Sequence, residues 1–249
     1  MSELVVKPQL GIAVADFDDI ANEFKIDSSD ILIPKILLMQ PSSEMVGDGL
    51  ATIGDYRNSV TKEKVGSINE PFSFVPFHYT KYWSVVVKGE GNEFVRKEEW
   101  LPGDENKPWE FEEEGRTLKR VKRLDFFGFD LKKVASGDIL PSILSFQSTG
   151  YREGTKILTQ FKLNISKRKL PWSDVWAISG EKKKNDNNQT YCVPKIDMIA
   201  ETDEETLAMC LDWYKSIKNK TKTIVVDESD VQSEISADAL RDVGDTGAY

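Results

Sequence analysis

The sequence has few of the residues from which metal sites and nucleophilic catalytic sites are built. Its 249 residues include two cysteines, Cys192 and Cys210, and one histidine, His78. A structural zinc needs four Cys, His or carboxylate ligands at characteristic spacings, and neither a C-x-x-C pair nor a second histidine is present. Nucleophilic catalysis with a histidine base would depend on His78 alone. We therefore expect a structural or surface role for His78, and no metal or cofactor.

Enzyme signature motifs are missing as well. Neither G-x-x-x-x-G-K-[ST] nor G-x-G-x-x-G occurs, which argues against a phosphate-binding or dinucleotide-binding loop. There is no G-x-S-x-G elbow, and "DFFGFD", which begins at Asp125, contains no D-F-G tripeptide. We expect that the chain is not an enzyme. Cleavage or joining of nucleic acid through carboxylates and magnesium is kept as a third hypothesis, testable by incubating the chain with DNA and divalent metal.

Long apolar runs are also absent. The longest, near Ile31, is interrupted by Pro34 and Lys35, and none approaches the roughly 18 residues of a membrane span. The first residues show no basic leader followed by an apolar stretch and a small-residue cleavage site. These features predict a cytoplasmic protein.

The negative net charge of −9 is distributed unevenly along the chain. Residues 227–249 hold seven acids and one base, and residues 90–114 hold ten acids and three bases. By contrast, residues 116–133 hold seven bases and two acids, and residues 155–184 hold eight bases and two acids. Aromatic residues are interleaved with the bases in both basic segments. The total charge therefore hides two cationic regions.

Interleaved bases and rings suit single-stranded nucleic acid, where cations follow the phosphates and rings stack on bases at about 1–3 kcal/mol per base. The alternative is that the bases face solvent while the rings fill the core. The predicted nucleic-acid-binding residues are Arg120, Lys122, Arg123, Phe127, Tyr151, Lys162, Lys167, Arg168, Lys169, Trp172, Trp176, Lys182, Lys183 and Lys184.

Most of the chain has the pattern of short strands separated by Gly, Asn and Pro. Residues 82–87 form a clear strand candidate, and the β pattern resumes at Arg116. In "ILTQFKLNIS", residues 157–166, alternation predicts a half-buried strand with Lys162 on its outward face. Residues 174–179 and 190–199 predict two further strands, and Pro194 assigns the second to a sheet edge or a bulge.

One helix is predicted near the end, at about residues 203–219. Thr202 and Glu205 have the spacing of a capping box, and the apolar residues that follow recur at helical spacing and should bury Cys210. The prediction is a mainly β fold with few helices (α+β), an OB-like antiparallel barrel, with a β-sandwich as the alternative. We expect the chain to have three parts: a lead 1–30 with a short helix at 16–24, one domain 31–223 with an acidic insertion 90–114, and a disordered acidic tail 224–249.

The pattern resembles the bacteriophage single-stranded DNA-binding proteins of the T7 type, which have an OB fold. The likeness is carried by "LPSILSFQSTGYREGTKILTQFKL", "LPWSDVWAISGEKKKNDNNQTYCVP", the helix near the end and the acidic tail ending in Tyr249. It covers residues 73–220 and the tail. The resemblance implies no catalytic residues, protein partners in DNA replication or recombination, and a place in the host cytoplasm. One departure is that "DVGDTGAY" separates the last acid, Asp245, from the terminal ring.

The first hypothesis is thus a protein that coats single-stranded DNA and whose tail occupies the basic surface until DNA displaces it, which then frees the tail for partner proteins. The tail residues concerned are Asp227, Glu228, Asp230, Glu234, Asp238, Asp242, Asp245 and Tyr249. The second hypothesis is a phage virion or assembly protein whose β domain is an interaction module. The chain is also a possible homo-oligomer. Steep loss of oligo-dT binding with salt would favour the first hypothesis, and absence of binding the second.

Overall fold

The computed structural model describes residues 32–89, 94–185 and 188–220, and the chain divides into two units, 1–32 and 33–249, of which the second is described here. The strands are β1 (Lys35–Leu38), β2 (Asp55–Asn58), β3 (Lys64–Ser67), β4 (Phe72–Val87), β5 (Phe94–Glu99), β6 (Glu110–Glu113), β7 (Arg116–Asp130), β8 (Ser142–Gln147), β9 (Asp174–Lys184) and β10 (Thr190–Glu201). The helices are α2 (Glu44–Gly47), the 3-10 helix η1 (Asp104–Asn106), α3 (Leu131–Ala135), α4 (Ser148–Ser166) and α5 (Glu204–Lys220). The predicted lead, with its helix at 16–24, and the tail lie outside the described residues.

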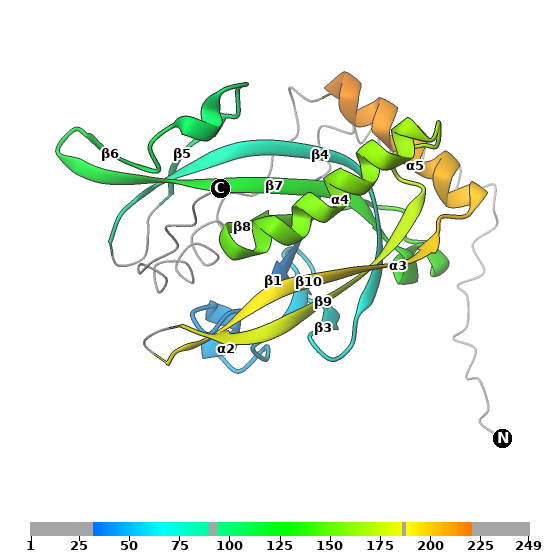
Figure 1. Ribbon diagram of the computed structural model, residues 1–249. Coiled ribbons are helices and arrows are strands. Elements are labelled where there is room, and N and C mark those ends of the chain that lie inside the picture. Colours follow the sequence, from blue (N-terminus) through cyan, green and yellow to red (C-terminus); the bar gives the residue numbers. More distant parts are fainter. Residues whose placement is uncertain (1–31, 90–93, 186–187, 221–249) are drawn as a thin grey trace, which may run out of the picture. The chain divides into compact units, whose positions relative to one another are not determined.

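The described strands form one connected sheet in the order β10-β9-β4-β7-β8-β1-β2-β3, with β5 added to β4 and β6 added to β7. All neighbours pair antiparallel except β1 and β8, which are parallel. Figure 1 shows the sheet strongly curled into a half-barrel around α4. The predicted mainly β fold with few helices is therefore confirmed, and the curled sheet is consistent with an OB-like barrel. One sheet is present in place of the two packed sheets of a β-sandwich.

β4 is strongly bent (Figure 1), and its ladder to β7 shifts register between Pro76 and His78. Proline cannot donate a ladder hydrogen bond, so it is tolerated at such a bulge. Gly128 of β7 pairs with Pro76, and a Cβ atom on Gly128 would lie 2.5 Å from the Phe74 ring and from the Val75 carbonyl oxygen. The close approach of the two backbones at the bend therefore requires glycine.

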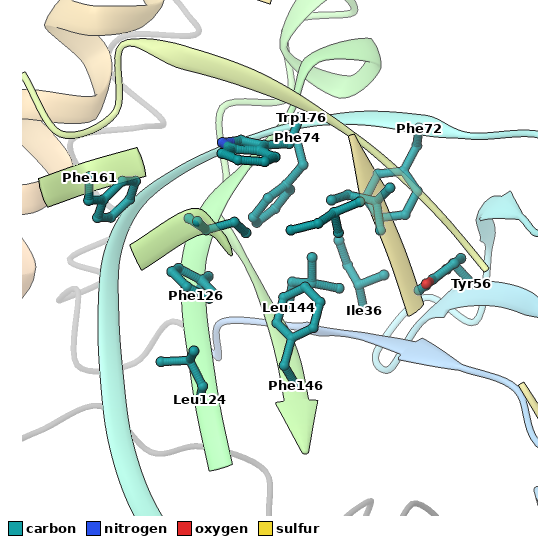
Figure 2. Close-up of a cluster of buried hydrophobic side chains, with 13 residues drawn as sticks. Ile36, Tyr56, Phe72, Phe74, Leu124, Phe126, Leu144, Phe146, Phe161 and Trp176 are labelled. Atoms are coloured by element: carbon teal, nitrogen blue, oxygen red, sulfur yellow. The ribbon is translucent and has the colours of Figure 1, made fainter. Parts of the chain in front are cut away.

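The concave face of the sheet is filled by α4. Ile157 and Phe161 of this helix are buried in a core cluster with residues of seven strands, shown in Figure 2. The predicted strand at residues 157–166 is therefore wrong. Ile157, Phe161 and Asn164 are buried at helical spacing, whereas Leu163 and Ile165, assigned to the buried face by alternation, are 45% and 61% exposed.

The opposite face is covered by α5 and α3. Successive strand residues point to opposite faces, so Phe126 belongs to the α4 side while Phe127 packs in a second cluster with Cys210 of α5. The predicted helix near 203–219 and the burial of Cys210 are confirmed. Its first turn is capped by Asp203, whose carboxylate accepts from the Thr206 backbone and hydroxyl, while the Thr202 hydroxyl donates to the Trp172 carbonyl.

The predicted acidic insertion, residues 90–114, contains β5, η1 and β6, which lie off the main path of the sheet. β5 pairs with residues 82–86 of β4, and β6 pairs with residues 116–119 of β7. We call residues 80–89 and 94–124 the arm. Figure 1 shows the arm extending beyond the end of α4, with β5 and β6 at its outer end. Pro194 lies in β10, which is an edge strand of the described sheet, as predicted.

Candidate nucleic-acid interface

Three of the four predicted stacking rings lie inside the protein. Phe127, Trp172 and Trp176 are 3%, 4% and 5% exposed, and each belongs to a core cluster. Trp172 packs against Tyr214 of α5 with ring centroids 5.2 Å apart. These rings stabilise the two faces of the sheet, so the prediction that they stack on bases is corrected. Tyr151, the fourth, is half-buried at the edge of the α4 cluster.

Two arginines of the segment 116–133, Arg120 and Arg123, are already engaged or buried. Arg123 is fully buried, and it lies on the face of β7 opposite to Lys122. The Arg120 Nε donates to Glu98 Oε2 at 2.7 Å, and its guanidinium lies 3.9 Å from the centroid of Phe111. Neither arginine presents a free charge to a phosphate, which corrects their predicted role.

The partner of Arg120 belongs to the acidic block that the charge distribution places apart from the bases. Burial raises the pKa of Glu98, but hydrogen bonds from Arg120 and Arg96 outweigh it and hold that pKa below its ordinary value. Arg96 also pairs with Glu113 of β6 at 2.6 Å. The acidic block therefore folds back on the basic segment and neutralises part of it.

The cations at the end of α4 are exposed. Lys162 lies on the helix, and Lys167, Arg168 and Lys169 form the turn that follows it. The Arg168 N–H donates to Ile165 O and the Lys169 N–H to Asn164 O, the two bonds of a Schellman motif. Lys169 Nζ pairs with Glu201 Oε1 at 2.7 Å. These cations also complement the negative end of the helix dipole, which is a structural role in itself.

Lys182, Lys183 and Lys184 are exposed at the end of β9, on a different ribbon from the arm. β9 joins β4 at Phe72–Phe74, whereas the arm is built on residues 82–87 at the other end of the same strand. Figure 1 shows the β9–β10 hairpin and the arm as two separate projections. The lysines of the β9–β10 hairpin and those of the arm therefore do not form one continuous surface.

A cluster of aromatic and cationic side chains on the arm was missed by sequence reasoning. The rings of Trp83 and Trp100 are stacked, with centroids 4.5 Å apart and planes 17° apart. Trp83 is buried, at 2% exposure, so Trp100, which is partly exposed, is the ring of this pair that a ligand could reach. Lys81 Nζ lies 3.6 Å from the Trp100 centroid, and Lys122 Nζ lies 5.3 Å from it and 5.5 Å from that of Trp83. Lys122 pairs with Trp83 across the β4–β7 ladder, so both are on one face.

This face continues onto α4. Tyr79, two residues before Lys81, is on the same side of β4 and is 43% exposed, and its ring centroid lies 6.4 Å from that of Phe161. Alternation in "YTKYW", residues 79–83, is the signal that could have revealed the row of Tyr79, Lys81 and Trp83. The stacking of Trp83 on Trp100 could not be predicted from this alternation, because Trp100 belongs to a distant segment.

The helix contributes its own row to the same surface. Gly154, Leu158 and Lys162 follow one another at four-residue spacing and so lie along one side of α4. A Cβ atom on Gly154 would be 3.0 Å from Leu124 and 2.9 Å from Phe146, so this side faces β7 and β8. Figure 1 shows α4 running beside β7. We call the resulting surface the inner stripe; its residues are Tyr79, Lys81, Trp83, Trp100, Lys122, Tyr151, Leu158 and Lys162.

The inner stripe brings together three of the predicted residues, Lys122, Tyr151 and Lys162, and adds rings and a lysine of β4 and the ring of Trp100, which directly follows β5. Burial raises the pKa of Tyr151 above its ordinary value, so its hydroxyl stays protonated at neutral pH. The loop between Trp100 and Trp109 is held by Asp104, whose carboxylate accepts from the Leu101 N–H and from Lys107. The stripe thus combines cationic and aromatic side chains along one face of the arm and one side of α4.

Within the described residues there is no group of three or more His, Cys, Asp or Glu side chains that could hold a metal ion. Among the same residues, no helix has the length and apolar character needed to cross a membrane.

The curled sheet with a helix in its concavity defines a mainly β protein with lysines and partly exposed rings along its inner face. The Pam3 phage gp34-like protein family has a model that matches residues 12–223, and the chain belongs to this family of phage proteins. Neither the curated proteins nor the solved structures yield a match to the chain.

Proposed function

We propose that the protein is a non-catalytic phage protein that binds single-stranded DNA along the inner stripe. The observation that supports this best is the alternation of lysines and rings on one face of the arm, where Lys81 and Lys122 lie over the stacked pair Trp83 and Trp100. Single-strand binding surfaces combine cations that follow the backbone with rings on which bases stack.

The energetics favour an exchange of partners at this cluster. A lysine over an exposed ring gains about 0.5–1 kcal/mol. A base stacked on a ring gains about 1–3 kcal/mol, and each phosphate contact also releases a condensed counterion. Binding a strand would move Lys81 from the Trp100 ring to a phosphate and leave that ring for a base. Tyr79, which is 43% exposed, offers the next stacking position.

The test is titration of oligo-dT over a salt series, with tryptophan fluorescence as the readout. We expect binding that weakens steeply with salt and quenches the fluorescence. A variant with Lys81→Gln, Lys122→Gln and Lys162→Gln should lower the magnitude of the slope of log K against log salt by about 2, at 0.7 per neutralised phosphate.

The matched control carries Lys62→Gln, Lys132→Gln and Lys215→Gln, three exposed lysines away from the stripe. It changes the net charge equally and should keep the slope of the unmodified chain. Circular dichroism establishes that both variants fold. Absence of oligo-dT binding at about 50 mM salt, or equal effects in the two variants, would overturn the proposal.

A second candidate, a virion or assembly protein, is favoured by a different observation. Met198 and Ile199 are 54% and 53% exposed on the edge strand β10, where they offer an apolar surface to another protein. Sedimentation separates the candidates: concentration-dependent association that Met198→Asp abolishes, in a chain that does not bind oligo-dT, would support the second.

A further inference from the structure

We propose that the end of the β9–β10 hairpin binds duplex nucleic acid. We call residues 181–185 and 188–192 the lysine ribbon. In it Lys182 pairs with Cys192, Lys183 with Tyr191 and Lys184 with Thr190. All three lysines are exposed. This is a site separate from the inner stripe, and the inference stands whether or not the stripe binds single strands.

The composition of this ribbon is unusual for a strand. Lysine is depleted in β-strands, and three adjacent cations repel one another. The opposing charge nearby is small: Glu181 Oε2 lies 3.6 Å from Lys183 Nζ, and the sequence has Asp186 in the connection, outside the described residues. No fold requirement explains Lys182–184, because β9 pairs with β4 only through residues 176–178 and pairs with β10 alone beyond them.

The geometry of the lysines distinguishes a duplex from a single strand. Successive side chains of a strand point to opposite faces, so Lys182 and Lys184 extend from one face of the ribbon and Lys183 from the other. A single strand would follow one face. A two-stranded ribbon inserted into the major groove, which is about 12 Å wide, has a wall of phosphates on each side. Cations on both faces match that arrangement.

The end of the ribbon is held in a defined shape. The Gln189 N–H donates to Asn185 Oδ1, the Asn185 amide donates to Gln189 Oε1, and Asn188 adopts a left-handed conformation with φ 60°. Asparagine tolerates this conformation better than most residues. The lysines are therefore presented on a preorganised hairpin, which lowers the ordering cost of binding.

The experiment compares a blunt 20-base-pair duplex with oligo-dT as probes, each over a salt series. The ribbon variant carries Lys182→Gln, Lys183→Gln and Lys184→Gln, and the control carries Lys62→Gln, Lys132→Gln and Lys215→Gln. We expect the ribbon variant to lower the magnitude of the duplex salt slope by about 2.7, at 0.9 per phosphate, and to leave the oligo-dT slope unchanged. The control should leave both slopes unchanged.

Each outcome has one meaning. A duplex slope that the ribbon variant does not change, or a chain that does not bind the duplex at about 50 mM salt, overturns the inference. Equal losses for duplex and oligo-dT also overturn it, because the lysines would then belong to the single-strand surface. Duplex binding without oligo-dT binding supports the inference and removes the function proposed for the inner stripe.

Discussion

Arg168 adopts a left-handed backbone conformation with φ 60° in the turn after α4, at the position where helices usually have glycine. For a residue with a side chain this conformation costs about 1–2 kcal/mol. Backbone strain of this kind is commonly found where a side chain serves a function. The cost is consistent with a role for the three consecutive cations of this turn outside the helix itself.

Two substitutions separate the strain from the charge. Both Arg168→Gly and Arg168→Gln remove the cation, but only glycine relieves the backbone. We expect Arg168→Gly to be more stable than Arg168→Gln by about 1 kcal/mol in urea unfolding, because glycine adopts this conformation without steric cost. Both should weaken oligo-dT binding to a similar extent if the turn contacts phosphates. Equal stabilities of the two variants would contradict the claim that the backbone is strained at residue 168.

His78 lies between the sheet and α5. Its ring centroid is 5.5 Å from that of Phe127 and 5.9 Å from that of Tyr214, and its Nε2 is buried with no hydrogen-bond partner in the described part of the chain. Burial lowers the pKa of His78 below its ordinary value. The histidine therefore has the structural role expected of it, since it joins α5 to the sheet in the neutral form.

The lowered pKa of His78 predicts how the stability of the protein changes with pH. Because the folded state binds the proton more weakly than the unfolded state, the contribution of His78 is fully present above the unfolded pKa of about 6.5 and is lost as the pH falls through the lower folded value. The free energy of unfolding should therefore decrease between pH 7 and 5. His78→Phe should reduce this slope while carboxylate titration stays the same, and an identical slope in the variant would contradict the assignment.

At the scale of elements, the outer edge of β10 is protected by three separate devices. The Gln40 amide donates to Cys192 O and accepts from Cys192 N–H, so it acts as a short piece of neighbouring strand. Pro194 has no N–H to offer. The Ile196 N–H donates to Glu153 of α4 at 3.3 Å. An edge with open donors and acceptors invites pairing with other chains, and these contacts prevent it.

Removal of the Gln40 amide should therefore be costly. Gln40→Ala leaves two buried backbone groups of Cys192 without partners, and we expect it to lower the free energy of unfolding by about 1–3 kcal/mol in urea titration. Gln189→Ala, at the exposed end of the hairpin, is the control and should change stability by less than about 0.5 kcal/mol. A Gln40→Ala variant as stable as the control would show that the hydrogen bonds from Gln40 to the edge of β10 do not contribute to stability.

The strands of the fold could be predicted from the sequence more readily than its longest helix. Alternation and turn residues indicated parts of β4, β7, β9 and β10, and helical spacing indicated α5. The helix α4 was missed because it lacks the usual helix signals. Gly150 and Gly154 are poor helix formers, retained because Cβ atoms would approach Pro194 at 2.8 Å and Phe146 at 2.9 Å, and its last turn ends in Arg168 in place of glycine.

The candidate site was likewise only partly predictable from the sequence. The sequence indicated that lysines and rings should combine on one surface, but placement depended on pairings between distant segments. Arg120 is not available to a phosphate because β5 folds back on β4 and brings Glu98 within hydrogen-bonding distance. Trp176 is not available to a base because it is buried in the core of the half-barrel. Trp83 and Trp100 meet only because β4 and β5 are neighbours. Neither pairing has a local sequence signal.

At the scale of the whole molecule, a negative net charge does not prevent binding of a polyanion, because the acidic residues can lie apart from the binding surface or compete with the ligand for it. The acidic block of the arm is engaged with its own arginines. The acidic residues after residue 226 lie outside the described part of the chain, and we propose that they compete with DNA for the exposed lysines.

Truncation after residue 226 tests this competition. The shortened chain loses seven acids and one base and should bind oligo-dT more tightly at low salt, with the difference shrinking as salt screens the charges. The control replaces residues 227–249 with a neutral Gly/Ser segment of equal length, which should bind as tightly as the truncated chain. Affinity that is unchanged in both would remove the regulatory role of the tail.

The parallel pairing of β1 with β8 has a consequence for biosynthesis. Lys35 lies beside Ile143, and Phe72 lies beside Ile178, so each ladder joins positions more than one hundred residues apart. A ribosome that adds about 5–20 residues per second exposes the first three strands for several seconds before their neighbours emerge. The nascent chain must therefore be held in an unfinished state, and synonymous codons that slow translation between residues 58 and 142 should lower the yield of folded protein.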